Sequence, residues 1–216
     1  MFSYTGDYTA DTDKACFTNG TASKDGTILT ATVDASYVTW STAGDYILWA
    51  VSSGDGVSST QGTIFFSLYV VDTVGDGTAI EIGRDTWDGD NYIRITVYGT
   101  DDKIRAYHVS DPDGDTTENS QNVISTGGIT ANTWYRVGYT WKVGNPGGHR
   151  VSVVALGNDP SWEAEADSNT LTDFNASLPI QNIVVGNKGI PATPGEARRV
   201  ANVVILSGYA ADDPLQ

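Results

Sequence analysis

The chain has 216 residues, of which 39% are hydrophobic and only 18% are charged. It carries 27 acidic against 12 basic residues, a formal net charge of −15, and 22 of the acids are Asp. Nucleic acids and anionic membranes attract clustered Lys and Arg, so this charge argues against both partners; no apolar run is long enough for membrane insertion. Calcium, neutral sugars and a cationic protein partner remain compatible with it.

Apolar residues alternate with polar ones in many short segments, and no long stretch has the spacing of an amphipathic helix. In chain order the predicted strands are Thr27–Asp34, Ser36–Trp40, Tyr46–Val51, Gly62–Val71, Thr78–Ile82, Asn91–Tyr98, Lys103–Val109, Val123–Thr126, Thr133–Val143, Arg150–Leu156, Ile180–Gly186 and Arg198–Leu206. Short strands separated by Gly- and Asp-rich turns predict a single all-β domain over residues 1–216, a two-sheet sandwich. Residues 1–30 are expected to form an N-terminal arm or edge strands.

The most specific local pattern is a hairpin formed by Asn91–Tyr98 and Lys103–Val109. The four-residue loop between these segments pairs Tyr98 with Lys103, which fixes the register. The resulting inward pairs are Val97 with Ile104, Ile95 with Ala106 and Ile93 with His108. This predicts a buried apolar face that includes one histidine.

The opposite face of the hairpin is rich in tyrosine and arginine. Its pairs are Thr96 with Arg105, Arg94 with Tyr107 and Tyr92 with Val109. Aromatic rings stack on sugar rings, and guanidinium groups donate to hydroxyls. We therefore expect a glycan-binding face with the residues Trp87, Tyr92, Arg94, Arg105 and Tyr107. The alternative is a sheet surface stabilised by Arg–Tyr stacking, or one that packs on another segment.

Two Asp-rich loops predict calcium binding, because calcium prefers clustered carboxylate and carbonyl oxygens. The candidate ligands are Asp85, Asp88 and Asp90 in the first loop, and Asp111, Asp113 and Asp115 in the second. Neither loop matches the EF-hand signature, since Gly114 comes two positions too early. Ordinary Asx turns are the alternative interpretation of both loops.

Five segments, in this order, resemble laminin-G-like members of the concanavalin A-like lectin/glucanase superfamily. They are Gly62–Val71, Trp87–Ile95, Asp102–Tyr107, Asn132–Trp141 with its Asn-Thr-Trp-Tyr-Arg-Val-Gly-Tyr-Thr-Trp strand, and Ile180–Gly186. The resemblance covers roughly residues 45 to 208 and implies a jelly-roll sandwich of two antiparallel sheets, one of them concave. It implies no single function, because the fold carries lectins, hydrolases, lyases and structural modules.

Glycosidases of this superfamily carry paired carboxylates on one strand face, as nucleophile and general acid. The local match here is Glu163, Glu165 and Asp167, which alternation places on one face. The match departs from the family pattern, because Glu165 stands where the pattern has a central Asp and Asp167 where it has a final Glu. In laminin-G-like domains, moreover, this segment is an edge hairpin. We interpret it as an edge strand protected by acidic residues.

Lyases of this fold need a Tyr/His pair with cations that bind an anionic sugar. Of the two histidines, His108 is expected in the core and His149 in a turn. A basic patch that favours a lyase would come from Arg84, Arg94, Arg105 and Arg136. The only cysteine, Cys16, allows no internal disulfide, and no nucleophile-elbow motif is present.

We expect a non-catalytic carbohydrate-binding module, extracellular or on a virion surface, whose partners are a glycan or polysaccharide and other virion or surface proteins. The alternatives are a structural virion protein, such as a bacteriophage capsid decoration protein or tail adhesin, and a glycoside hydrolase or polysaccharide lyase. The residues after Met1 lack the apolar core of a signal peptide. Either the protein acts without secretion, or Met1 replaces a natural leader.

Overall fold

The computed structural model describes residues 2–3, 21–23, 32–33, 38–40, 46–50, 57–71, 77–83, 91–98, 102–111, 119–144, 147–156, 158, 162, 171–174, 180–186, 198–206 and 208–209. Side chains are described from residue 57 onwards, except at 198, 201 and 202. This part of the chain contains strands and no helix, so the all-β prediction is confirmed. It accordingly contains no helix with the length and hydropathy needed to span a membrane.

The strands follow the predicted segments closely. They are β1 (Phe2–Ser3), β2 (Thr21–Ser23), β3 (Thr32–Val33), β4 (Val38–Trp40), β5 (Tyr46–Ala50), β6 (Gln61–Val70), β7 (Gly77–Gly83), β8 (Tyr92–Tyr98), β9 (Lys103–Ser110), β10 (Asn119–Ile124), β11 (Thr133–Lys142), β12 (Gly148–Ala155), β13 (Asn182–Gly186) and β14 (Arg198–Leu206). Every predicted strand overlaps one of these, whereas β1 and β2 had no counterpart in the prediction.

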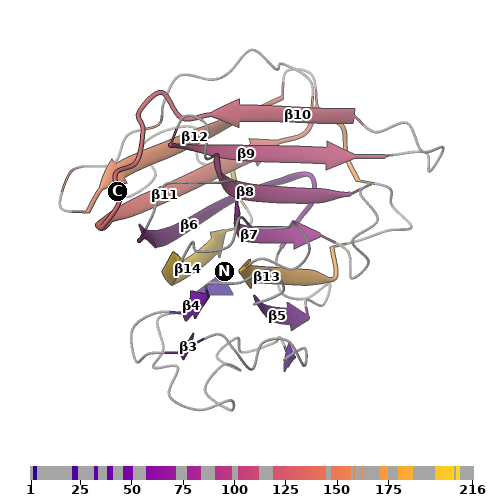
Figure 1. The fold of residues 1–216 in the computed structure, drawn as a ribbon. Helices are drawn as coiled ribbons and strands as arrows, with labels where there is room; N and C mark the ends of the chain where they lie inside the picture. The colour runs from indigo at the N-terminus through magenta and orange to yellow at the C-terminus, as the bar shows by residue number, and fades with distance from the viewer. Residues whose placement is uncertain are drawn as a thin grey trace.

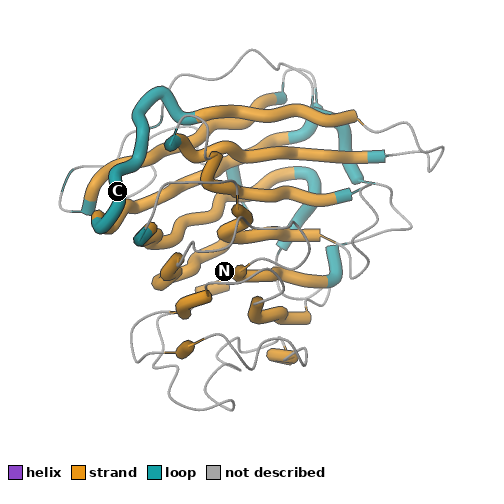
Figure 2. The backbone as a smooth tube through the Cα atoms, in the orientation of Figure 1, coloured by secondary structure: helices purple, strands orange, loops and turns teal. Residues whose placement is uncertain are grey.

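Two antiparallel sheets form a jelly-roll β-sandwich. We call them the β9 sheet, with the order β10-β9-β8-β7-β13-β5-β2, and the β6 sheet, with the order β12-β11-β6-β14-β4-β3 and β1 paired to β14. In Figure 1 the β9 sheet runs from β10 at the top down to β5, and Figure 2 shows that strands make up most of the described backbone. Neighbours in each sheet are often far apart in sequence, as β6 and β14 are.

The core lies between the two sheets and follows the period-two alternation of the strands. In β6 the inward side chains Ile64, Phe66 and Leu68 are buried, and in β8 the buried set is Ile93, Ile95 and Val97. The largest fully buried side chains include Trp141 and Tyr139 of β11. Trp134 lies on the outer face of the same strand and is half-buried, so the two tryptophans point to opposite sides, as their odd separation along a strand requires.

Two local predictions were wrong. The strand expected at Val123–Thr126 runs instead over Asn119–Ile124, because β10 is an edge strand that pairs along β9 while exposing polar side chains such as Asn122. The first half of β10 is polar and lacks apolar alternation, so the sequence did not indicate a strand there. His149, expected in a turn, lies in β12 opposite Trp141 and is fully buried, because the strand starts immediately after the glycine turn.

Candidate functional site

The structure confirms the predicted register of the β8–β9 hairpin. Tyr98 pairs with Lys103, and the remaining pairs follow in order as far as Tyr92 opposite Val109. Because side chains alternate between faces, the inward set enters the core and the Tyr/Arg set points away from the β6 sheet. The length of the segment between Tyr98 and Lys103 was therefore sufficient to predict whether each side chain of the hairpin points inward or outward.

Four of the five predicted ligand-binding residues thus share the outer face of the β9 sheet: Tyr92, Arg94, Arg105 and Tyr107. Each is partly exposed. Trp87, the fifth, lies outside the described residues. The sheet itself, rather than loops, positions these four side chains, and a site on paired strands is held more rigidly than one on loops.

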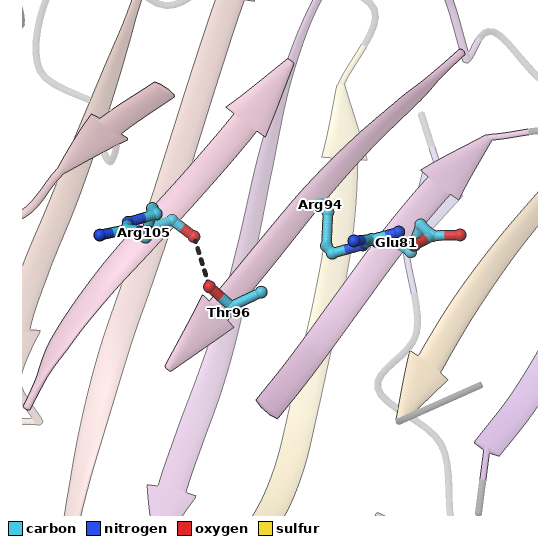
Figure 3. A network of polar contacts seen from close by, with 4 residues as sticks. All are labelled: Glu81, Arg94, Thr96 and Arg105. Atoms are coloured by element: carbon cyan, nitrogen blue, oxygen red, sulfur yellow. Dashed lines mark hydrogen bonds and ion pairs between the residues drawn. The ribbon is translucent and has the colours of Figure 1, made fainter. Parts of the chain in front are cut away.

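Arg105 is the most constrained side chain on this face. Its guanidinium carbon lies 3.3 Å from the centroid of the Tyr98 ring and 5.5 Å from that of Tyr107. Its Nη1 donates a hydrogen bond of 2.6 Å to the Tyr107 hydroxyl. The Thr96 hydroxyl donates to the Arg105 carbonyl oxygen at 3.3 Å, the bond drawn in Figure 3. Cation–π and hydrogen-bond contacts together fix the direction of this cation.

Arg94, one pair further along the hairpin, lies beside a carboxylate. Its Nε is 2.7 Å from Glu81 Oε2 of the neighbouring strand β7, and the two side chains are 14% and 6% exposed. The pair is labelled in Figure 3. The Arg94 guanidinium also lies 4.1 Å from the ring centroid of Tyr92. Arg94 is thus charge-balanced within the sheet.

Exposure on this face increases from the middle of the β9 sheet toward its β10 edge. Glu81 on β7 and Val184 on β13 point outward by alternation, yet they are only 5% and 3% exposed. On β10, Ser120 and Asn122 share the face of Tyr107 and are exposed. A surface ligand therefore has most room over β9 and β10, next to Arg105 and Tyr107.

Three members of this face were not predicted from the sequence: Tyr98, Glu81 and Asn122. Tyr98 carried a usable signal, because it continues the alternation of Tyr92 and Arg94 along the same strand. Glu81 carried none, because the segment between β7 and β8 is too long in sequence to fix their register, and a register shift lies between Thr78 and Ile80. Asn122 was missed because the strand was predicted to begin at Val123, one residue after it.

Asp111 is the only predicted calcium ligand among the described residues. It is buried, and its backbone N–H donates to Asn91 Oδ1 at 3.2 Å, so Asp111 and Asn91 lie next to each other. The other five, Asp85, Asp88, Asp90, Asp113 and Asp115, lie outside the described residues. Within the described part, no group of three His, Cys, Asp or Glu is placed to hold a metal. Calcium binding stays a prediction.

Both histidines of the chain are buried between the sheets. His108 of β9 is 1% exposed, as predicted for a core residue, and His149 of β12 is 0% exposed. The Tyr139 hydroxyl and His149 Nδ1 are 3.1 Å apart, and the His108 ring lies 5.3 Å from that of Phe174. Burial lowers the pKa of each to about 4, and the charge of His149 further lowers that of His108. Neither imidazole reaches a ligand on the surface.

Aromatic residues also occur on the outer face of the β6 sheet. Tyr69 and Trp134 lie with ring centroids 5.4 Å apart, and the Arg199 guanidinium is 4.9 Å from the Tyr69 centroid. Trp162 is half-buried, and the centroid of its ring lies 5.8 Å from that of Phe65. The hydrolase candidates Glu163, Glu165 and Asp167, and also Cys16, lie outside the described residues.

No protein-family model and no curated protein matches the sequence. Solved structures do match in fold. The botulinum neurotoxin serotype D ligand-binding domain in complex with N-acetylneuraminic acid has a TM-score of 0.64 at 12% identity, covering 97% of this chain and 47% of that one. A structure of botulinum neurotoxin type C, whose cell entry depends on two ganglioside molecules, gives 0.64 at 11% identity, with coverage of 97% and 48%.

The marine PL-14 alginate lyase from Aplysia kurodai also matches, with a TM-score of 0.64 at 12% identity. This match covers 95% of the present chain and 98% of the lyase. By contrast, the chain spans about half the length of the botulinum domains. At these identities the similarity establishes the jelly-roll fold, and function has to be argued from the site.

Proposed function

We propose that this protein is a non-catalytic carbohydrate-binding module of the concanavalin A-like type, displayed on a surface or particle. The observation that carries the proposal is the outward face formed by Tyr92, Arg94, Arg105 and Tyr107. These side chains come from adjacent strands in a fixed register, so their spacing is set before a ligand arrives. Pre-organisation of this kind lowers the entropic cost of binding.

The face offers the two interactions on which sugar recognition depends. Tyrosine rings present apolar surface for the C–H side of a pyranose, and the guanidinium and amide groups hydrogen-bond its hydroxyls. The exposed Asn122 beside Tyr107 adds an amide that both donates and accepts. The sugar-binding context of the botulinum domains supports the same proposal.

The absence of a histidine from this face supports a non-catalytic role. Since His108 and His149 are buried in the core, a Tyr/His acid–base pair cannot form on the surface of the β9 sheet. Arg105 and Tyr107 instead contact each other, which stabilises the face itself. These contacts support a role in binding without turnover.

We expect Tyr107→Ala to weaken glycan binding about 10-fold, which corresponds to about 1.4 kcal/mol. The measurement is a glycan array with the purified chain, followed by titration of the best ligand, in calcium and in chelator. Tyr69→Ala is the matched control, because it removes a half-buried tyrosine from the outer face of the other sheet. That variant is expected to bind like wild type.

The results would separate the proposal from its alternatives. Equal losses in both tyrosine variants would contradict a site on the β9 sheet. If no glycan on the array is bound, either in calcium or in chelator, the glycan proposal is contradicted and a structural virion protein is favoured. A signal lost only in chelator would support calcium bound by the Asp-rich loops.

A polysaccharide lyase is the second candidate, favoured by the match to the alginate lyase over nearly the whole of both chains. In that chemistry a base removes the proton at C5 of a uronate, the electron pair of this C–H bond forms the C4–C5 double bond, and the C4–O4 bond breaks as O4 takes up a proton and leaves as a hydroxyl. Tyr107, with its hydroxyl on Arg105, is the group on the β9 face that would act as the base. Incubation with alginate and detection of the ultraviolet absorbance of the new double bond tests this; we expect no increase.

A further inference from the structure

Arg105 and Arg94 differ in their charge partners. Arg94 lies 2.7 Å from Glu81, so its charge is compensated inside the sheet. No carboxylate in the described part of the chain lies within ion-pair distance of Arg105, whose guanidinium contacts Tyr98 and Tyr107. In a chain with 27 acidic residues, the described neighbours that contact Arg105 are thus aromatic rings and not acids.

The Arg105 cation is also held in a fixed position. Tyr98 covers one face of its guanidinium, and the Tyr107 hydroxyl accepts one of its hydrogen bonds. Burial on its own lowers the pKa of Arg105, but hydrogen bonds to Tyr107 and Tyr98 raise it above the ordinary value. The side chain therefore presents a permanent positive charge with few rotamers left to lose.

The most exposed side chains next to this cation lie on β10. Arg105 pairs with Ile124, and Tyr107 pairs with Asn122, which is exposed on the same face. A sugar seated on Tyr107 would therefore have the Asn122 amide on one side and the Arg105 guanidinium within reach along the strand. This arrangement suits a sugar that carries both hydroxyls and an anionic group.

We infer that the β9 face selects saccharides bearing a single carboxylated sugar, such as a sialic or uronic acid residue, and that Arg105 binds the carboxylate. The inference rests on the proposed glycan-binding function and adds the charge of the ligand to it. Guanidinium pairs with a carboxylate through parallel, charge-assisted hydrogen bonds. No acidic neighbour in the described part of the chain competes for that position.

The net charge of the chain limits how acidic this ligand can be. At −15 the molecule repels a long polyanion as a whole, whereas a lone carboxylate close to Arg105 experiences mainly the local cation. Exposed charges are screened beyond about 8 Å at physiological salt, so the local contact dominates for a short ligand. A singly charged oligosaccharide is therefore preferred over a polyuronate.

The test begins with an array of sialylated and uronate-terminated oligosaccharides printed beside their neutral counterparts. The strongest acidic ligand is then titrated as the free acid and as its methyl ester, which keeps the sugar and removes the charge. We expect the free acid to bind at least 10-fold more tightly than the ester at 0.15 M NaCl. In Arg105→Gln this preference should disappear, and in Arg105→Lys it should be partly restored.

Arg136→Gln is the control, because it removes the same charge from the outer face of the β6 sheet. The Arg136→Gln variant should keep the wild-type preference for the free acid over its methyl ester. If Arg105→Gln fails to fold, the comparison of acid and ester on wild type decides the matter without a variant. Equal binding of acid and ester, or stronger binding of neutral glycans, would overturn the inference and leave the glycan-binding function in place. An array with no bound glycan would overturn both.

Discussion

Replacing Gly62 by alanine is expected to lower the free energy of unfolding by about 3 kcal/mol, at the upper end of overpacking costs. Gly62 of β6 pairs with Trp141, and a Cβ at this position would lie 2.4 Å from two ring atoms of that indole. The indole has no room to move away, because Trp141 is fully buried and its Nε1 donates to the Ser59 carbonyl at 3.2 Å. Glycine is required here for close approach of the ring.

The measurement is urea denaturation or a thermal melt, in which about 3 kcal/mol corresponds to roughly 6–12 °C for a chain of this size. Gly127→Ala is the matched control, since a Cβ there would meet nothing within 4 Å. It should change stability by less than about 0.5 kcal/mol. Equal melting temperatures for the two variants would show that the indole can move after all, and that the core around Trp141 is looser than its burial indicates.

The hairpin shows how far a sequence determines local structure. A four-residue loop and strict alternation were enough to predict each β8–β9 pair and the face of every side chain. Alternation also accounts for Trp134 and Trp141 pointing to opposite sides of β11. Such predictions depend only on neighbours in sequence, which is why they were accurate.

Contacts between distant segments could not be predicted in this way. The ion pair of Glu81 with Arg94 depends on a register across the β7–β8 loop and on a shift after Thr78. The position of β10 depends on its pairing with β9, because edge strands need no apolar pattern. The half-burial of Trp162 depends on its contact with Phe65 of another segment. In each case tertiary contact overrides local pattern.

The Tyr/Arg face has a structural role whether or not it binds a sugar. Arg105 links Tyr98 with Tyr107, and Arg94 links Tyr92 with Glu81, so cations connect neighbouring side chains over three strands. Contacts of this kind contribute about 0.5–1 kcal/mol each at exposed sites. Stabilising contacts and a rigid ligand face are compatible, because the same contacts that hold the sheet surface also fix the direction of Arg105.

Acidification is expected to destabilise the protein steeply below about pH 6.5. His108 and His149 are neutral in the folded core, where burial lowers the pKa of each to about 4 from an ordinary value of 6.5. Between these values the unfolded chain binds protons that the folded chain does not. The stability present above pH 6.5 is therefore lost as the pH falls toward 4, by up to about 1.4 kcal/mol per pH unit for each histidine.

Unfolding free energies measured by urea denaturation from pH 8 to pH 4 test this expectation, with His108→Gln, His149→Gln and the double variant beside wild type. Glutamine does not titrate, and at position 149 its amide can still hydrogen-bond the Tyr139 hydroxyl. The double variant should be less stable at pH 8 but lose less stability on acidification, so the two curves converge toward pH 4. Parallel curves would assign the acid sensitivity to carboxylates, since those titrate in every variant. Convergence would instead show that protonation of His108 and His149 opposes the packing of the two sheets, because both imidazoles have to stay uncharged in the folded protein.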